Sequence, residues 1–435
     1  MTPAGRLAAA IEVLEAIEAS GRPADQVASF YFKSRRYIGA KDRRAVTETV
    51  WRVLRRKARL NWWLERISPD QTDARARVLA DMVIDGGQLP DDELFQGPHA
   101  APKPDAEDRK ILERLRQEPL FHRDQPAWVR GEYPEWLEDR LIATFGDQLP
   151  GQMGAMREEA GIDLRVNTLK ATREQAVAAL AKQGVQTTPT KLSPIGLRLS
   201  KRIALVEVPA WRDGLIEIQD EGSQLVALLA DARPGMAVVD YCSGAGGKTL
   251  AMAATMENKG RIVACDVAEW RVDKAGPRLR RADVNNVTRR VITGQSDKWI
   301  KRNAGAFDRV LVDAPCSGSG TWRRNPDAKW QMTPQDLAEV VASQSVILDS
   351  ASRLVKAGGR LIYATCSILA EENEDQIAKF LDRHPEFKPI PVTEVWPGFS
   401  PDPCPVAGPW LRLSPLEHGT DGFFAAVLEK NQGEG

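Results

Sequence analysis

Cysteine, histidine and long apolar runs are scarce in this sequence. Five cysteines and four histidines are spread over 435 residues, and no Cys-x-x-Cys pair occurs. An odd number of scattered cysteines is typical of free thiols in a reducing compartment and excludes a disulfide scaffold. The same scarcity argues against a structural zinc site, so we expect no metal. No apolar run approaches the roughly 18 residues that a membrane helix needs, so we expect no membrane partner.

The chain also lacks a net charge, since 60 basic residues balance 60 acidic ones. Its overall charge therefore indicates no class of partner. The apolar N-terminal stretch is interrupted by Glu12, Glu15 and Glu18, which a signal peptide would not carry. We expect a soluble, cytoplasmic protein that acts as a monomer.

Residues 1–95 are predicted to form a helical domain, because apolar residues recur at helical spacing in the stretches 7–17 and 46–53. Between residues 33 and 59, eleven basic residues stand against two acidic ones, with Trp51 inside the run. A segregated basic block of this kind is typical of RNA-binding surfaces. The alternative is a solvated helix face with tryptophans in the core.

The next two segments differ from the first in composition. Residues 96–115 begin rich in proline and alanine and are predicted to be a linker. Residues 116–215 are predicted to form a small α+β module. Its expected elements are a helix between Pro134 and Gly146, a strand at 163–169, a helix at 172–183 and short strands at 197–200 and 204–208.

Residues 216–435 are predicted to form a doubly wound α/β domain, because short apolar strands alternate with longer helical stretches. The strands are expected at 236–241, 261–267, 289–292, 308–314 and 360–365. Their nearly continuous apolar character is typical of a mostly parallel sheet that is buried on both faces. The stretches 410–415 and 423–430 are predicted to form an antiparallel pair at one edge.

Informative polar segments follow these strands, at the edge where doubly wound sheets bind ligands. The glycine-rich segment 240–249 reads DYCSGAGGKT. Its GGKT ending is similar to a nucleotide phosphate loop, but that pattern needs glycine where this chain has Cys242, which disfavours an NTPase. Glycines here allow the backbone to approach a ligand closely. Asp266 follows the second strand, where it can bind ribose hydroxyls, cap the next helix, or do both.

Two further segments, 313–320 and 364–367, each place a cysteine directly after a strand. A single cysteine in such a place is usually a small buried hydrophobe, as we expect of Cys265. Cys316 and Cys366, however, follow two consecutive strands. They are therefore predicted to face one cleft from neighbouring strands.

The segments DYCSGAGGKT, DAPCSGSGTWRRNPDAKW and ATCS resemble, in this order and spacing, the Fmu/Sun–nucleolar-protein family of RNA cytosine-5 methyltransferases. The likeness extends over essentially the whole chain. It implies a Rossmann-like class I methyltransferase domain at 216–435, preceded by an RNA-recognition-like module at 116–215. The helical domain at 1–95 resembles the antitermination-factor-like RNA-binding domain of the bacterial 16S ribosomal RNA methyltransferase B branch.

The resemblance implies S-adenosylmethionine as the cofactor, with Asp266 on its ribose. The implied cofactor-binding residues are Cys242, Ser243, Gly244, Ala245, Gly246, Gly247, Lys248, Asp266, Arg271, Asp297 and Asp313. The first loop departs from the family, whose usual Ala-Ala-Pro is replaced by Ser-Gly-Ala at 243–245. The contact to adenine is assigned to Asp297, with Gln295 and Ser296 as alternatives.

The implied catalytic residues are Cys366, Cys316, Asp313 and Lys248. Carbon 5 of cytosine is a poor nucleophile, and a thiolate that adds to carbon 6 activates it towards an electrophilic methyl group. The resemblance assigns this attack to Cys366 and assistance in release to Cys316. It places Asp313 near the methyl donor and the base, and Lys248 near the cytosine.

The expected partner is RNA, most specifically 16S ribosomal RNA. Residues 271–302 contain ten basic and three acidic residues, and the tract Trp-Arg-Arg-Asn follows at 322–325. Basic groups beside aromatic rings suit single-stranded RNA. The alternatives are a transfer RNA methyltransferase and a non-catalytic RNA-binding ribosome-assembly factor, which would need neither thiol.

Overall fold

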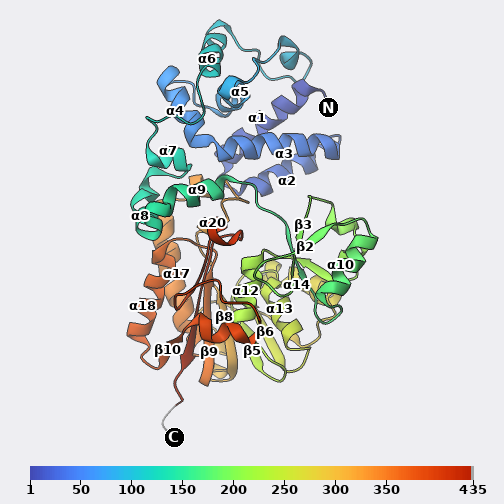
Figure 1. The fold of residues 1–435 in the computed structure, drawn as a ribbon, viewed down its shortest axis with the longest axis vertical. Coiled ribbons are helices and arrows are strands. Elements are labelled where there is room, and N and C mark those ends of the chain that lie inside the picture. Colours follow the sequence, from blue (N-terminus) through green and yellow to red (C-terminus); the bar gives the residue numbers. More distant parts are fainter. Residues whose placement is uncertain (433–435) are drawn as a thin grey trace. The chain divides into compact units, whose positions relative to one another are not determined.

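The computed structural model describes residues 1–432, which divide into two compact units (Figure 1). One unit, the helical unit, consists of Met1–Glu158 and Trp322–Met332. The other, the sheet unit, consists of Glu159–Thr321 and the chain from Thr333 onwards. In the described part of the chain, no helix is both long and apolar enough to cross a membrane.

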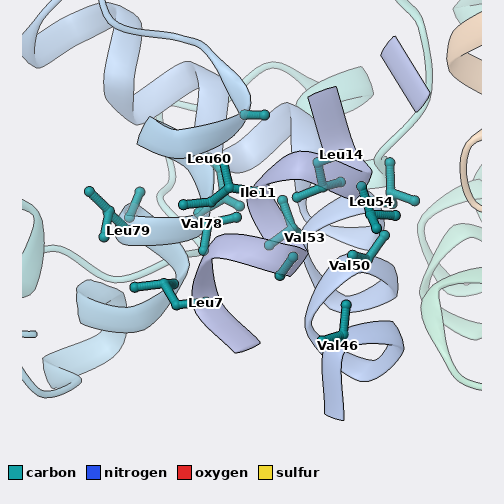
Figure 2. Close-up of a cluster of buried hydrophobic side chains, with 14 of the residues drawn as sticks. Leu7, Ile11, Leu14, Val46, Val50, Val53, Leu54, Leu60, Val78 and Leu79 are labelled. Carbon is teal, nitrogen blue, oxygen red and sulfur yellow. The ribbon is translucent and has the colours of Figure 1, made fainter. Parts of the chain in front are cut away.

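The helical unit buries the apolar stripes that the sequence predicts. Its helices are α1 (Pro3–Ser20), α2 (Ala24–Ser34), α3 (Ala40–Arg55), α4 (Lys57–Ile67), α5 (Ala74–Val83), α6 (Ala106–Arg116), α7 (Ala127–Gly131), α8 (Glu138–Phe145), α9 (Leu149–Arg157) and α16 (Ala328–Gln331). Ile11 of α1 and Val50 of α3 lie in one cluster with Leu60 of α4 and Val78 of α5 (Figure 2). The predicted helical periodicity of the stretches 7–17 and 46–53 is confirmed.

Helix α6 begins inside the segment predicted to be a linker. The Asp105 side chain accepts hydrogen bonds from the backbone N–H groups of Glu107 and Asp108, which starts the helix at Ala106. Ile111 and Leu115 of α6 then join the helical core. Residues 116–158 are also largely helical and belong to the same compact unit as α1–α6. The predicted helix after Pro134 ends at Gly146, whose φ of 50° breaks the helical backbone.

The basic block at 33–59 is partly neutralised within the helical unit. Asp81, whose side chain is fully buried, accepts hydrogen bonds from Arg52 at 2.5 Å and Arg56 at 2.9 Å. Arg59 pairs at 2.7 Å with the buried Glu132. Arg59 is thus a core residue, whereas Arg52 and Arg56 stay partly exposed while they pair with a buried acid. A count of charges along the sequence does not reveal these ion pairs.

The sheet unit contains a small four-stranded antiparallel sheet with the order β2-β3-β1-β4. Its elements are β1 (Asp163–Val166), α10 (Arg173–Lys182), β2 (Thr187–Pro189), β3 (Gly196–Leu199), α11 (Pro209–Arg212) and β4 (Ile216–Ile218). The strand predicted at 204–208 is wrong. A 3-10 turn, Leu205–Glu207, forms there, because the N–H groups of Glu207 and Val208 donate to carbonyls three residues back.

The larger sheet has eight strands and confirms the predicted fold class. Its order is β10-β12-β9-β8-β5-β6-β7, with β11 paired to β12. The strands are β5 (Ala237–Asp240), β6 (Arg261–Asp266), β7 (Val287–Val291), β8 (Phe307–Asp313), β9 (Val355–Thr365), β10 (Phe387–Ile390), β11 (Leu411–Leu413) and β12 (Phe423–Lys430). Strands β5 to β9 run parallel, and β12 is antiparallel to its neighbours, including β11 as predicted.

Helices cover both faces of this sheet (Figure 1). They are α12 (Glu221–Leu229), α13 (Gly247–Thr255), α14 (Glu269–Arg281), α15 (Lys298–Arg302), α17 (Pro334–Ser352), α18 (Glu374–Arg383), α19 (Val392–Val395) and α20 (Pro415–His418). Val238 of β5 packs in a cluster with residues of α12 and α13, whereas the next residue, Val239, packs in a cluster with residues of α17 and α18. The sheet is therefore doubly wound.

Candidate active site

The parallel strands bring the carboxyl ends of β5, β6, β8 and β9 to one edge of the sheet. In the strand register, Asp240 pairs with Ala264 of β6 and with Leu311 of β8, and Asp313 pairs with Ala364 of β9. The four sequence segments with informative polar residues therefore follow neighbouring strands, and their side chains meet at this edge.

Cys316 and Cys366 contact each other. Their Sγ atoms lie 3.3 Å apart, and both side chains are partly buried. The contact with Cys366, burial and the negative charges of Cys366 and Glu372 raise the pKa of Cys316 well above its usual value. At neutral pH, Cys316 is accordingly a protonated thiol beside the second sulfur.

Lys248 and Asp313 form an ion pair beside these thiols. The Lys248 Nζ donates to Asp313 Oδ2 over 2.6 Å, from the first turn of α13 to the end of β8. Burial lowers the pKa of Lys248, but the charges of Asp313, Cys366 and Asp240 outweigh it and leave this pKa raised. Lys248 therefore carries a positive charge in the neighbourhood of Cys366.

The glycine-rich loop is tied to the end of β6 by Asp266. Asp266 Oδ2 accepts a hydrogen bond of 2.9 Å from the Gly244 N–H, and Oδ1 accepts one of 2.9 Å from Ala268 N–H. Gly244 has a φ of 53°, and a Cβ built on it would meet nothing within 4 Å. The loop therefore leaves open space beside an acidic side chain. Asp266 therefore accepts hydrogen bonds both from the glycine-rich loop and from the start of the next helical segment.

Asp240 adds a buried polar atom to the same edge. Its Oδ2 accepts a hydrogen bond of 2.6 Å from the Thr249 hydroxyl, while Oδ1 is buried without a hydrogen-bond partner among the described residues. Burial raises the pKa of Asp240 to about 7. An unpartnered buried oxygen beside an open glycine turn fits a site for a polar ligand.

Two candidates for cofactor contact lie less centrally. Arg271 is exposed on α14, with its guanidinium 5.3 Å from the centre of the Trp270 ring. Asp297 caps α15 and accepts hydrogen bonds from the N–H groups of Thr293 and Trp299. These backbone hydrogen bonds hold the pKa of Asp297 below its usual range. Both residues stay predictions as cofactor ligands.

Sequence reasoning missed a set of side chains that surround the two thiols. Glu372 is fully buried and accepts hydrogen bonds from both cysteine loops. The set also contains Ser317, Ser319, Gln344 and Ser367. The only signal in the sequence was that Glu371 and Glu372 follow the Thr-Cys-Ser segment within a few residues.

The parallel sheet covered by helices on both faces, with its glycine loop and strand-end acid, defines a Rossmann-like class I methyltransferase. A family model described as 16S rRNA methyltransferase RsmB/F matches residues 227–429, and a second, for an RsmF/B-like ferredoxin-like domain, matches residues 133–206. The chain belongs to the RsmB/F family of methyltransferases.

Relatives and solved structures agree with this assignment. Ribosomal RNA small subunit methyltransferase B of Pectobacterium atrosepticum is 30% identical over 91% of this chain and 92% of its own length. The probable ribosomal RNA small subunit methyltransferase B of Synechocystis is 33% identical over 71% of this chain and 69% of its own length. The crystal structure of a methyltransferase homologue from Pyrococcus horikoshii is 30% identical, with a TM-score of 0.60 over 70% of this chain and 97% of that chain.

Proposed function

We propose that this protein methylates carbon 5 of a cytosine in 16S ribosomal RNA, with S-adenosylmethionine as the methyl donor and Cys366 as a covalent nucleophile. The observation that carries the proposal is the pair of thiols, 3.3 Å apart, beside the ion pair of Lys248 and Asp313. A fold that only bound RNA would need neither thiol. A methyltransferase that activates a cytosine ring can use one thiol to add to carbon 6 and the other to assist release.

The surroundings of the two thiols support different roles for them. Cys366 lies near the positive charge of Lys248, and a cysteine adds to carbon 6 as a thiolate. The pKa of Cys316 is raised by its contact with Cys366, by burial and by nearby negative charge. A thiol that stays protonated does not compete with Cys366 for the ring.

The covalent step changes the cytosine ring as follows. The Cys366 thiolate forms a bond to carbon 6, and the electron pair of the 5,6 double bond makes carbon 5 nucleophilic. Carbon 5 gains its methyl group with S-adenosylhomocysteine as the leaving group, and a solvent water then accepts the proton of carbon 5. The electrons of that C–H bond restore the double bond and expel Cys366 as a thiolate. Cys316 is the second group in place to assist this release.

The residues at the strand ends fit S-adenosylmethionine, which supplies an electrophilic methyl group when it is bound. Gly244 offers open space, and Asp266 presents a carboxylate in the position that binds ribose hydroxyls in this fold class. The unpartnered Oδ1 of Asp240 is available to a polar group of the same ligand. We assign residues 242–248 and Asp266 to this site, with Asp313 at its border to the base.

The substrate assignment depends on the relatives and on surface chemistry. The relatives from Pectobacterium atrosepticum and Synechocystis are both named as ribosomal RNA small subunit methyltransferase B. On the helical unit, Phe30 is 75% and Tyr37 is 73% exposed, in the same stretch as the exposed Lys33 and Arg36. Exposed aromatic rings with cations suit unpaired bases and phosphates.

We also propose that the functional domains of the chain are residues 1–95, 116–215 and 216–435, with residues 96–115 between the first two.

The test is a methyl-transfer assay with radiolabelled S-adenosylmethionine. Purified protein is incubated with unmodified 16S ribosomal RNA, 30S subunits or transfer RNA, and the nucleosides are then separated after digestion. Label in 5-methylcytidine from 16S ribosomal RNA is the expected result, and Cys404→Ala should behave as wild type. Label in another nucleoside would overturn the reaction. Label confined to transfer RNA would overturn the substrate.

A further inference from the structure

Glu372 joins the two loops that carry the thiols. It lies in the 3-10 turn Ala370–Glu372 after β9 and is completely buried. Its Oε1 accepts hydrogen bonds from the Ser317 N–H at 2.8 Å and from the Gln344 side chain at 2.9 Å. Its Oε2 accepts from the hydroxyls of Ser317, at 2.5 Å, and Ser367. One carboxylate therefore receives four hydrogen bonds.

The two serines each follow one of the thiols directly. Ser317 is the neighbour of Cys316, and Ser367 is the neighbour of Cys366. Ser319 strengthens the connection, because its hydroxyl contacts the Ser367 hydroxyl at 2.9 Å and accepts from the Ile368 N–H at 3.0 Å. The backbone adds a further link of 2.9 Å from the Gly320 N–H to the Cys366 carbonyl.

We propose that Glu372 is a positioning residue that holds Cys316 and Cys366 in contact as one catalytic unit. Its carboxylate binds Ser317, Ser367 and Gln344, so it acts on the sulfur atoms through the two serines. This inference deepens the proposed function and depends on it for the meaning of the kinetic result. The geometric part can be tested without any catalytic activity.

An ionised carboxylate suits this place better than an amide does. Each carboxylate oxygen only accepts hydrogen bonds, and here each faces two donors. A glutamine would turn one acceptor into an NH2 donor. In one orientation that NH2 group would face two other donors, the Ser317 N–H and the Gln344 amide. In the other it would face the hydroxyls of Ser317 and Ser367, which would have to reorient. Glu372→Gln therefore keeps the size of the side chain and disrupts these four hydrogen bonds, which we call the Glu372 clamp.

The charge of Glu372 has a second consequence. After contact with Cys366 and burial, the negative charges of Cys366 and Glu372 are the further causes of the raised pKa of Cys316. Loss of this charge lowers the pKa of Cys316 and increases its thiolate form at alkaline pH. A residue that only stabilised the fold would leave that pH dependence unchanged.

The geometric experiment uses glutathione disulfide on the full-length protein. One cysteine thiolate attacks the reagent, forms a mixed disulfide and releases one glutathione thiolate. The second cysteine then closes the Cys316–Cys366 disulfide and releases the other glutathione. Peptide mass spectrometry gives the ratio of closed to mixed disulfide, which measures how close the two sulfurs are held.

We expect closed disulfide to predominate in the wild type, because thiols held in contact react as an intramolecular pair. In Glu372→Gln the ratio of closed to mixed disulfide should fall by roughly tenfold or more. Ser367→Ala should lower it in the same direction, and this variant serves if Glu372→Gln does not fold. Asp375→Asn, which removes an exposed charge three residues along the chain, is the matched control. An unchanged ratio in folded Glu372→Gln would overturn the clamp.

The kinetic experiment compares the same variants in methyl transfer. We expect Glu372→Gln to lower kcat by roughly tenfold or more while KM for RNA and the affinity for S-adenosylmethionine stay near wild type. The alkaline limb of its pH–rate profile should move to lower pH. A rise in KM with unchanged kcat and pH profile would overturn the role. If the wild type itself fails to methylate cytosine, the proposed function fails and the disulfide ratio still decides the clamp.

Discussion

Cys316 and Cys366 lie 50 residues apart in the sequence, and their Sγ atoms lie 3.3 Å apart at the ends of two neighbouring parallel strands. Two thiolates at this distance would repel each other, so the pair is expected to hold at least one proton at neutral pH. Contact, burial and nearby charge raise the pKa of Cys316. The two thiols therefore differ in their surroundings, and Cys366 is the one that we propose as the nucleophile.

The different roles of the two thiols predict different failures for the two alanine variants. Cys366→Ala should be inactive and form no covalent adduct with RNA, because no nucleophile remains at carbon 6. Cys316→Ala should still allow attack by Cys366, while release of the methylated RNA stalls. A denaturing gel after incubation with S-adenosylmethionine and RNA should therefore show an adduct with Cys316→Ala alone.

The opposite pattern, with an adduct in Cys366→Ala and none in Cys316→Ala, would exchange the two roles. Full methylation by both variants without any adduct would remove the covalent mechanism. Cys404→Ala is the control for loss of a thiol elsewhere in the chain, and it should behave as wild type.

Lys248 should be needed for the reaction more than for binding RNA. Its ammonium lies 2.6 Å from Asp313, and its charge interacts with that of Cys366. Lys248→Met removes a buried cation at the site of developing charge, so kcat should fall by roughly 100-fold or more. Lys248→Arg should recover part of this loss. Single-turnover methyl transfer, with RNA affinity measured separately, tests the assignment; equal kcat in wild type and Lys248→Met would contradict it.

Asp266 should control affinity for S-adenosylmethionine. The carboxylate lies next to the open side of Gly244 and binds its N–H at 2.9 Å. Asp266→Ala removes a charge-assisted hydrogen bond and a tie to the loop, which we expect to weaken cofactor binding by about 10- to 150-fold. RNA affinity should change little. Calorimetry compares this variant with Asp273→Ala, which removes an exposed acid from α14; equal cofactor affinity in the two would place the ribose elsewhere.

The succession of strands and helices around the site could be predicted from the sequence, because buried parallel strands are nearly continuous apolar runs. This pattern marks the strands β5, β6, β8 and β9 and the cysteines that follow β8 and β9. The short strands β2, β4 and β10 escape it. They have only three or four residues, too few for a clear alternation, and β2 and β10 also contain a proline.

Partners that are distant in the sequence could not be predicted. Glu372 and Ser317 are 55 residues apart, and nothing local marks one as the acceptor of the other. The same holds for Asp81, which pairs with Arg52 and Arg56 of the predicted RNA-binding block. Charge counts along a chain indicate the total of a segment, whereas tertiary packing decides which charges stay available to a ligand.

Asp240 should make stability depend on pH. Burial raises its pKa from about 3.8 to about 7, so the folded state holds a proton that the unfolded state loses across this interval. The unfolding free energy should therefore fall as the pH rises from about 4 to about 7, and stay lowered above that. Asp240→Asn, which keeps an acceptor for Thr249, should lack this component. Urea denaturation of both proteins at pH 5 and pH 8 measures this dependence. If the unfolding free energies of variant and wild type differ by the same amount at both pH values, the prediction is contradicted.

The basic block should separate into residues that bind RNA and residues that hold the helical unit together. Lys33, Arg36 and Lys41 are exposed, whereas Arg52 and Arg56 bind the buried Asp81. A triple change of the exposed residues to Gln should weaken RNA binding and flatten its salt dependence. On single-stranded RNA, the logarithmic salt slope should fall by about 0.7 for each phosphate that the protein no longer neutralises. Thermal stability should stay near wild type.

The double change Arg52→Gln and Arg56→Gln should have the reverse effect, because it leaves the Asp81 carboxylate buried without its cations. We expect a lower melting temperature and, below that temperature, an RNA salt slope close to that of the wild type. Filter binding over a salt series and thermal denaturation of both variants decide between the two roles. An unchanged salt slope in the triple variant would make the exposed residues an ordinary solvated face, and a changed slope in the stable double variant would return Arg52 and Arg56 to the RNA surface.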